Sequence, residues 1–496
     1  MTTAHTIERL TVRWGVVPDE QRRRAQQLQE ALVDIALDDV LDGIGVASHE
    51  EVCVRDVVVP PYACRWTDTD AQLLDGWSRA IAAAIAASID RADVVRYSSR
   101  HHAVIDLITS TLAGDTERAW AWAQLDLLPR DAAVATAGGW PPNGREQAEV
   151  LVRTLLARPH LVVGALVQSA RRGVLAAAVH AFGSAGLAAV VDAAWTAGGG
   201  AMQRWAVGAR PAPMGRNTLR ESRPERVAQR VAMASSIWKT VVADAGIATS
   251  GDDLRAFAAL AVLEAEPVFV ASVGAPWLVE AIVATASAAA PPAVLGALMP
   301  VFGHERAQNQ GEKDRAPVTS RGAEPAPDPE PARTAWGGLV FLVHLVVATG
   351  AVDRFVERAD ASGRALLWAL GRALVDRAAV DDDPTVPDDD PALLAFCGLP
   401  PGAPVPETDG DVSTEAELVD AALRELIKPT GGDGDGGHED PLRLVCHRDA
   451  TVEAEPGWID VVFALDDVCT DVRRAGLDLD PGYVPALGCV LRFRYA

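Results

Sequence analysis

Two adjacent histidines, His101 and His102, are of a type that could bind a metal ion. They lie in RYSSRHHAVID, a stretch that we expect to be helical. Neighbouring residues on a helix point in different directions, so two adjacent imidazoles cannot easily share one ion. The pattern therefore favours histidines on the surface or in the core of a helix over a metal site.

Four acidic residues, Asp433, Asp435, Glu439 and Asp440, gather in GGDGDGGHEDP. Oxygen ligands of this kind are typical of a calcium loop, but these residues lack the regular ligand spacing of an EF-hand. We expect a solvated linker here rather than a cation site.

Four further carboxylates, Asp466, Asp467, Asp478 and Asp480, could work as paired general acids and bases. Helix caps and turns account for all four equally well, because aspartate is favoured at both kinds of position. We therefore assign none of them to catalysis.

Motifs of nucleotide, metal and nucleophile sites are missing from the sequence. It has no GxxxxGK[ST], no GxGxxG after a strand and no GxSxG, and HEEVC at 49–53 lacks the second histidine of HExxH. The pair Trp120 and Trp122 could form a ligand platform, but large aromatics in an alanine-rich chain more often fill core gaps. We expect no catalytic residue, no cofactor and no metal.

The charge and the cysteines narrow the class of protein. A formal net charge of −23 over 496 residues opposes binding to nucleic acid or to anionic lipid. The six cysteines form no CxxC pair, and the first residues, MTTAHTIERLTVRW, lack the pattern of a signal peptide. These features favour a reduced, cytoplasmic protein.

The elements that would position these residues begin with a β-α-β-α module over residues 1–92. Residues 5–16 and 51–59 have the alternation of strands, and residues 68–90 have the pattern of a helix. Residues 93–302 are alanine-rich and predict a long helical region. Residues 303–335 contain almost no apolar side chains and predict a disordered linker.

The most apolar stretch is WGGLVFLVHLVVATG at 336–350. A membrane span needs roughly 20 apolar residues, so a run this short, closed by Asp353 and Arg354, predicts a buried helix. Residues 336–400 as a whole are expected to be helical, and residues 401–440 an acidic, flexible linker.

The last segment, residues 441–496, predicts a C-terminal α/β module. In GWIDVVFALDD, Ile459, Val461, Phe463 and Leu465 alternate onto one strand face. Asp467 is placed to cap a short helix that stops at Gly476. The fold class is therefore mainly α, with small α/β modules at both termini and an alanine-rich helical middle in several segments.

The final strand, CVLRFRY, places Arg492 and Arg494 on the face opposite its apolar side chains. Arginines are favoured at interfaces, so this pair could be a docking face. A solvated strand face explains the two arginines equally well.

Three segments resemble the tape measure proteins of contractile injection systems, which are phage-tail-like particles. They are HTIERLTVRW with AQQLQEAL and EVCVRDVVV; HHAVIDLITSTLAG with RAWAWAQLDLLP and VLVRTLLARP; and WGGLVFLVHLVVATGAVDRF with WALGRALV and DDPALLAFCGLP. The ending, RRAGLDLDPGYVPALGCVLRFRYA, is also similar to proteins of such gene clusters. The likeness covers about half of the chain, and no residue in it does chemistry.

The resemblance implies a non-catalytic assembly protein that occupies the lumen of the tail tube and sets its length. Its partners would be the tube and baseplate proteins, without nucleic acid or a membrane span, and it could form a homo-oligomer. The alternatives are an effector cargo or enzyme without a recognisable motif, and a soluble adaptor or chaperone.

Overall fold

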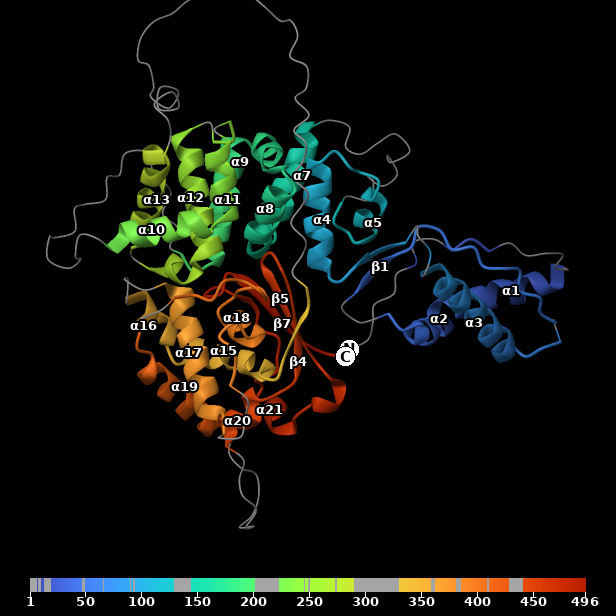
Figure 1. Cartoon of the computed structure of the whole chain (residues 1–496). Coiled ribbons are helices and arrows are strands. Elements are labelled where there is room, and N and C mark those ends of the chain that lie inside the picture. Colours follow the sequence, from blue (N-terminus) through green and yellow to red (C-terminus); the bar gives the residue numbers. More distant parts are fainter. Residues whose placement is uncertain are drawn as a thin grey trace, which may run out of the picture. The chain divides into compact units, whose positions relative to one another are not determined.

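The computed structural model describes most of the chain and separates it into two compact units, Met1–Val150 and Leu151–Ala496 (Figure 1). The longer described stretches are 19–46, 50–65, 67–89, 94–128, 144–200, 223–244, 250–272, 274–289, 330–357, 362–380, 385–407, 410–427 and 440–496. The described residues are mainly helical with two small sheets, so the predicted fold class is confirmed.

The first unit begins with a small helical core. Helix α1 (Asp19–Ala31) continues through a π-helical turn (Leu32–Ala36) into α2 (Leu37–Leu41), and both contact α3 (Asp70–Ile89). Apolar side chains from these elements share a core, namely Leu32, Leu37, Leu41 and Ile81. The predicted helix over 68–90 is thus present.

The strand predicted at 51–59 is much shorter than expected. Strand β1 covers only Glu51–Cys53 and pairs antiparallel with β2 (Val95–Tyr97). Among the described residues, no strand pairs with 54–59, and Val58 is 81% exposed. Of residues 5–16, those that the structure describes do not form a strand. Of the predicted β-α-β-α module, the structure thus contains the helix at 70–89 and a three-residue part of the second strand, and most of the first strand lies outside the described residues.

Two helices complete the described part of this unit before the chain enters the second. They are α4 (Arg100–Leu112) and α5 (Ala119–Gln124), and α7 (Gly144–Leu156) then crosses the boundary between the units. The sequence places α4 and α5 in the helical middle, yet their residues belong to the first unit.

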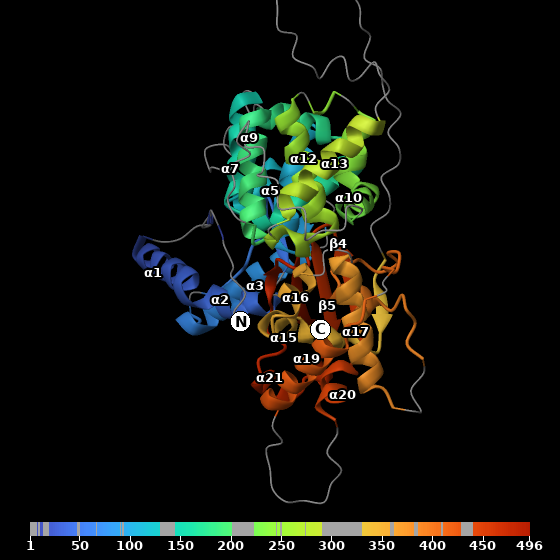
Figure 2. The same ribbon diagram turned by 90° about the vertical axis from the view of Figure 1, so that its left-hand side faces the viewer.

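The second unit contains a helical bundle, which we define as residues 159–289. Its helices are α8 (Val162–Arg171), α9 (Leu175–Ala197), α10 (Arg223–Ala234), α11 (Ser236–Ala243), α12 (Gly251–Ala265) and α13 (Ala275–Ala289). Helix α12 lies between α9 and α13 (Figure 2). Its residues 256–263 are all buried, and its alanines let the neighbouring helices approach closely.

Helix α9 is the one helix in the described residues that is long and apolar enough to cross a membrane, by length and composition only. Core helices pass the same test, and 39% of its apolar window is buried in the structure. Leu187, Val190 and Val191 of α9 are fully buried.

The second unit also contains an α/β lobe, which we define as residues 330–496. Its sheet has the order β3-β4-β5-β7-β6, and only β5 and β7 are parallel neighbours. The strands are β3 (Ala332–Thr334), β4 (Ala450–Glu455), β5 (Trp458–Phe463), β6 (Gly482–Val484) and β7 (Cys489–Tyr495). Helices cover one face of this sheet (Figure 1). Residues 336–400 and 441–496, predicted as separate segments, therefore share one core.

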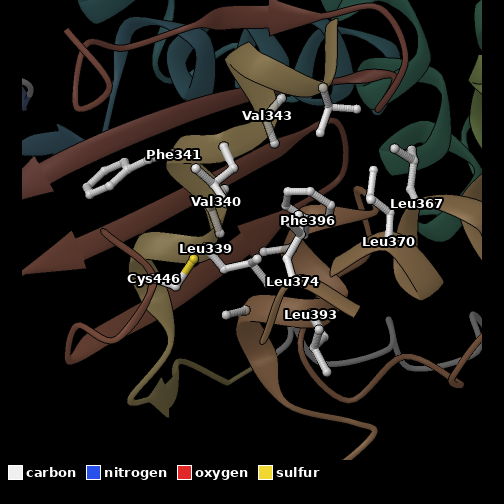
Figure 3. Close-up of a cluster of buried hydrophobic side chains, with 14 of the residues drawn as sticks. Leu339, Val340, Phe341, Val343, Leu367, Leu370, Leu374, Leu393, Phe396 and Cys446 are labelled. Carbon is white, nitrogen blue, oxygen red and sulfur yellow. The ribbon is translucent and has the colours of Figure 1, made fainter. Parts of the chain in front are cut away.

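Most helices of the lobe are short, except α17 and α19 with 16 and 14 residues. After a 3₁₀ helix (Gly337–Leu342) come α15 (Val343–Ala348), α16 (Ala351–Glu357), α17 (Gly363–Ala378), α18 (Pro391–Phe396), α19 (Ser413–Leu426), α20 (Pro441–Cys446) and α21 (Thr470–Arg474). Side chains from the 3₁₀ helix, α15, α17, α18 and α20 gather in one cluster (Figure 3). Phe341 stacks on Phe463 of the sheet, with ring centroids 4.9 Å apart.

The apolar stretch is buried over 336–346 apart from the half-buried His344, as the sequence predicts, whereas Val347 is 54% exposed. Its first half is a 3₁₀ helix. Two glycines allow it to reach the rest of the lobe. A Cβ at Gly337 would lie 2.3 Å from Cβ of Ala450, and one at Gly338 would lie 1.8 Å from the carbonyl oxygen of Val445. Such distances are excluded for any larger residue.

Both predicted linkers contain ordered elements. Residues 332–334 form β3, which extends the sheet, while 303–329 lie outside the described residues. Residues 413–426 form α19, because Ala416, Val419 and Leu423 recur at helical spacing and enter the core. Residues 428–439 lie outside the described part of the chain.

Candidate functional site

The predicted docking residues, Arg492 and Arg494, lie on the face of the sheet opposite the helices. The parallel register pairs Asp460 of β5 with Arg492 of β7. The carboxylate of Asp460 accepts hydrogen bonds from Nε of Arg492 at 2.9 Å and from its Nη2 at 2.6 Å. Nη1 of Arg494 reaches the same carboxylate at 3.3 Å and Glu453 at 3.4 Å.

This cluster is largely withdrawn from solvent. The side chains of Asp460, Arg492 and Arg494 are 6%, 15% and 21% exposed. The guanidinium of Arg492 lies over the Trp458 ring at 5.0 Å, and the indole Nε1 of Trp458 donates to Asp460 at 2.7 Å. Arg492 is thus held on both sides, and docking through it would first have to break a bidentate ion pair.

The four C-terminal carboxylates serve different local structures. Asp466 and Asp467 lie in a 3₁₀ turn, and Asp467 does not cap α21, whose N-cap residue is Cys469. This differs from the prediction, as does Leu465, which follows the end of β5 and is 65% exposed. Gly476 ends the helix region with a positive φ of 71°, as predicted.

Asp478 and Asp480 fasten the segment between α21 and β6. Oδ2 of Asp478 accepts from Nε of Arg473 at 2.8 Å and from the Tyr495 hydroxyl at 3.2 Å. Oδ1 of Asp480 accepts from the backbone N–H of Phe493 at 2.6 Å, and burial raises the pKa of Asp480. Both carboxylates therefore bind this segment to β7.

The two histidines lie at the start of α4. The ring Nδ1 of His102 is 2.6 Å from Oγ of Ser98, and its backbone N–H donates to the N-cap residue Ser99 at 3.3 Å. Within the described ranges, no group of three or more His, Cys, Asp or Glu residues could hold a metal ion.

Of the predicted acidic cluster, Asp433, Asp435 and Glu439 lie outside the described residues. Asp440 caps α20 by accepting from the backbone N–H of Leu442 at 3.3 Å. It also pairs with Arg424 at 2.9 Å.

Of the tryptophan pair, Trp122 belongs to a polar centre that sequence reasoning missed, whereas Trp120 is half-buried with the Arg55 guanidinium 5.9 Å from its ring centroid. Asp106 of α4 is buried and accepts hydrogen bonds from the Tyr97 hydroxyl (2.8 Å), Ser110 (3.0 Å), Arg118 (3.0 Å) and the Trp122 indole (3.1 Å). Trp122 is fully buried, which fits the packing interpretation. Burial, then the nearby Asp106, raises the pKa of Tyr97. The sequence feature that could have indicated this buried centre is Asp106, which lies inside the apolar run AVIDLI.

Among the described residues, Asp440, Asp478, Asp480, Asp106, His102 and Arg492 thus each have a structural partner. The carboxylates cap helices or join strands, and the aromatic donors satisfy a buried carboxylate. No protein-family model matches the chain, and neither do curated proteins or solved structures.

Proposed function

We propose that this chain is a non-catalytic assembly protein of a contractile injection system, in which it acts as the tape measure of the tail tube. The proposal starts from the resemblance of the three sequence segments. It includes tube and baseplate proteins as partners and a cytoplasmic place of assembly.

One observation supports the proposal most directly. The distinctive residues of the third segment serve packing rather than a reaction. Gly338 touches the backbone of Val445, and Gly371 lies against Phe396, where a Cβ would be 2.9 Å from a ring carbon. Gly398 has a φ of +74° beside the carbonyl oxygen of Leu487. A sequence pattern composed of such positions preserves a shape, as a structural protein requires.

The alanine-rich helices give the proposal a physical scale. A single helix over 93–302 would span about 315 Å at most, at about 1.5 Å per residue. In the structure the helices of 159–289 lie side by side in the bundle (Figure 2). Measuring length by extension would therefore require the bundle to open during assembly.

The test is a set of nested in-frame deletions, lacking 223–243 or 223–289, followed by electron microscopy of the particles. A ruler predicts tubes shortened in proportion to the number of residues removed, by about 1.5 Å per residue for a helical ruler. A matched insertion that duplicates 223–243 should lengthen the tube by the same amount. Normal particles of unchanged length would contradict the ruler.

Complete removal of the chain, read by the same microscopy, separates the alternatives from the ruler. An effector cargo would be dispensable for assembly, so complete removal of the chain would leave particles of normal length and number. An adaptor or chaperone would change the number of particles without changing tube length. Sheath, tube and baseplate genes beside this gene would support the assembly proposal independently.

A further inference from the structure

The bundle and the α/β lobe of the second unit meet at a buried polar junction. Its centre is Glu266, which follows the last residue of α12 and is 5% exposed. The carboxylate accepts from the Ser362 hydroxyl and from the backbone N–H groups of Gly363 (2.9 Å) and Arg364 (3.4 Å). A residue of the bundle thereby caps the N-terminus of α17 in the lobe.

Arg364 makes the return connection. Its Nε donates to the carbonyl oxygen of Ala265 at 2.8 Å, and its Nη2 donates to that of Glu264 at 2.9 Å. Its Nη1 donates to the carbonyl oxygens of Cys397 (2.9 Å) and Gly398 at the end of α18. One guanidinium thus binds the last turns of two helices that belong to different parts of the unit.

The junction also contains apolar contacts from residues 267–271 of the bundle, which are buried at Val268, Phe269 and Val270. In the core cluster of the lobe, Val268 is the one member from the bundle among the described residues. The backbones also approach closely: a Cβ at Gly363 would lie 2.5 Å from Cβ of Val268, and one at Gly488 would lie 2.9 Å from the Leu263 carbonyl oxygen. The hydrogen bonds of Glu266 and Arg364 form one network of charged groups, so loss of one partner weakens the others.

The neighbouring residue Glu264 also caps a helix, but this helix lies within the bundle. Its carboxylate accepts from the backbone N–H of Ser236 (2.7 Å) and from the Ser235 hydroxyl (2.6 Å), at the start of α11 inside the bundle. Glu264 fastens the bundle to itself, whereas Glu266 fastens it to the lobe. The two caps can therefore be broken separately by substitution.

We propose that Glu266 and Arg364 form a lock that holds the helical bundle against the α/β lobe, and that opening it releases the bundle for extension during assembly. The inference rests on the proposed function for the role of the extension. The lock itself is a property of the isolated chain.

The test is hydrogen exchange followed by mass spectrometry on the purified full chain, comparing Arg364→Met with wild type. Losing several charged hydrogen bonds should speed exchange roughly 100-fold at 263–271 and at the start of α17. Peptides from the centre of α12 and from β5 should exchange at the wild-type rate. The control is Arg372→Met on the same helix, because Arg372 bonds to Val386 and Asp388 within the lobe.

Glu266→Gln provides a second variant of nearly unchanged shape, which should reproduce the faster exchange at the same two places. Exchange at 263–271 within about threefold of wild type in both variants would overturn the lock. Simultaneous acceleration in α12, β5 and the junction would also overturn it, because bundle and lobe would then open as one body. The exchange experiment does not measure tube length. If the tape measure proposal fails, the lock between Glu266 and Arg364 is still tested by exchange alone.

Discussion

Asp460 and Arg492 lie directly opposite each other on the parallel strands β5 and β7, joined by a bidentate ion pair of 2.9 and 2.6 Å. Arg494 contacts the same carboxylate through a single longer bond of 3.3 Å. The two arginines, similar by sequence, therefore differ in how firmly they are held.

Arg492→Ala is expected to lower the free energy of unfolding by about 3 kcal/mol, because it leaves the buried Asp460 carboxylate without its main partner. Arg494→Ala should lower it by only about 1 kcal/mol. Urea unfolding of the full chain measures both, with Arg474→Ala as an exposed control. Equal losses for Arg492→Ala and Arg494→Ala would contradict this assignment.

Gly338→Ala is expected to destabilise the lobe by about 3 kcal/mol or more, because the new Cβ would lie 1.8 Å from the Val445 carbonyl oxygen and the backbone must move. Gly251→Ala is the matched control, since nothing but the far end of Arg255, at 3.9 Å, lies near its Cβ position. Thermal unfolding compares the two, and similar melting temperatures would show that the 3₁₀ helix can shift freely.

The sequence predicted the elements whose residues carry a strong local pattern. The last strand is an example: CVLRFRY alternates, and Cys489, Leu491 and Phe493 are buried in β7 while Arg492 and Arg494 lie on the other face. The buried apolar stretch and the mainly helical fold follow from the same reasoning. In each case the spacing of apolar residues within one short segment is enough to predict the element.

The sequence could not reveal features that depend on distant partners. Nothing near Arg492 indicates Asp460, which lies 32 residues away, and Glu266 is about a hundred residues from the helix that it caps. The prediction of a strand over 51–59 was wrong beyond Cys53, because its alternating pattern gave no information on the partner strand. Only three residues of β2 pair with it. Helix α19 was missed because flanking acidic residues masked its apolar stripe.

Asp390→Asn is expected to change the pH dependence of stability. Asp390 caps α18 and accepts from Thr334, but burial is the larger influence and raises its pKa above the ordinary 3.8. The folded state therefore binds the proton more tightly than the unfolded state. The stabilisation from this group is fully present below pH 3.8 and is lost as the pH rises from 3.8 through the raised pKa.

Asparagine keeps the cap but does not titrate, so the stability of Asp390→Asn relative to wild type should increase between pH 4 and pH 7. Urea unfolding at several pH values measures the difference. If the stability of Asp390→Asn relative to wild type decreases as the pH rises, the pKa of Asp390 is lowered in the folded state and not raised.

The six cysteines are all free, and their reactivity should separate them into two groups. Burial raises the pKa of Cys53, Cys397 and Cys489 to about 12, and it also raises that of Cys446. The thiolate is the reactive form, so these thiols are almost inert at pH 8. Cys64 and Cys469 are only half-buried. Iodoacetamide at pH 8 should therefore modify these two in the native chain and all six in denaturant, as read by mass spectrometry. The variant with both replaced by serine should remain unmodified when native, and rapid labelling of Cys397 or Cys446 would show that the core of the lobe opens to solvent.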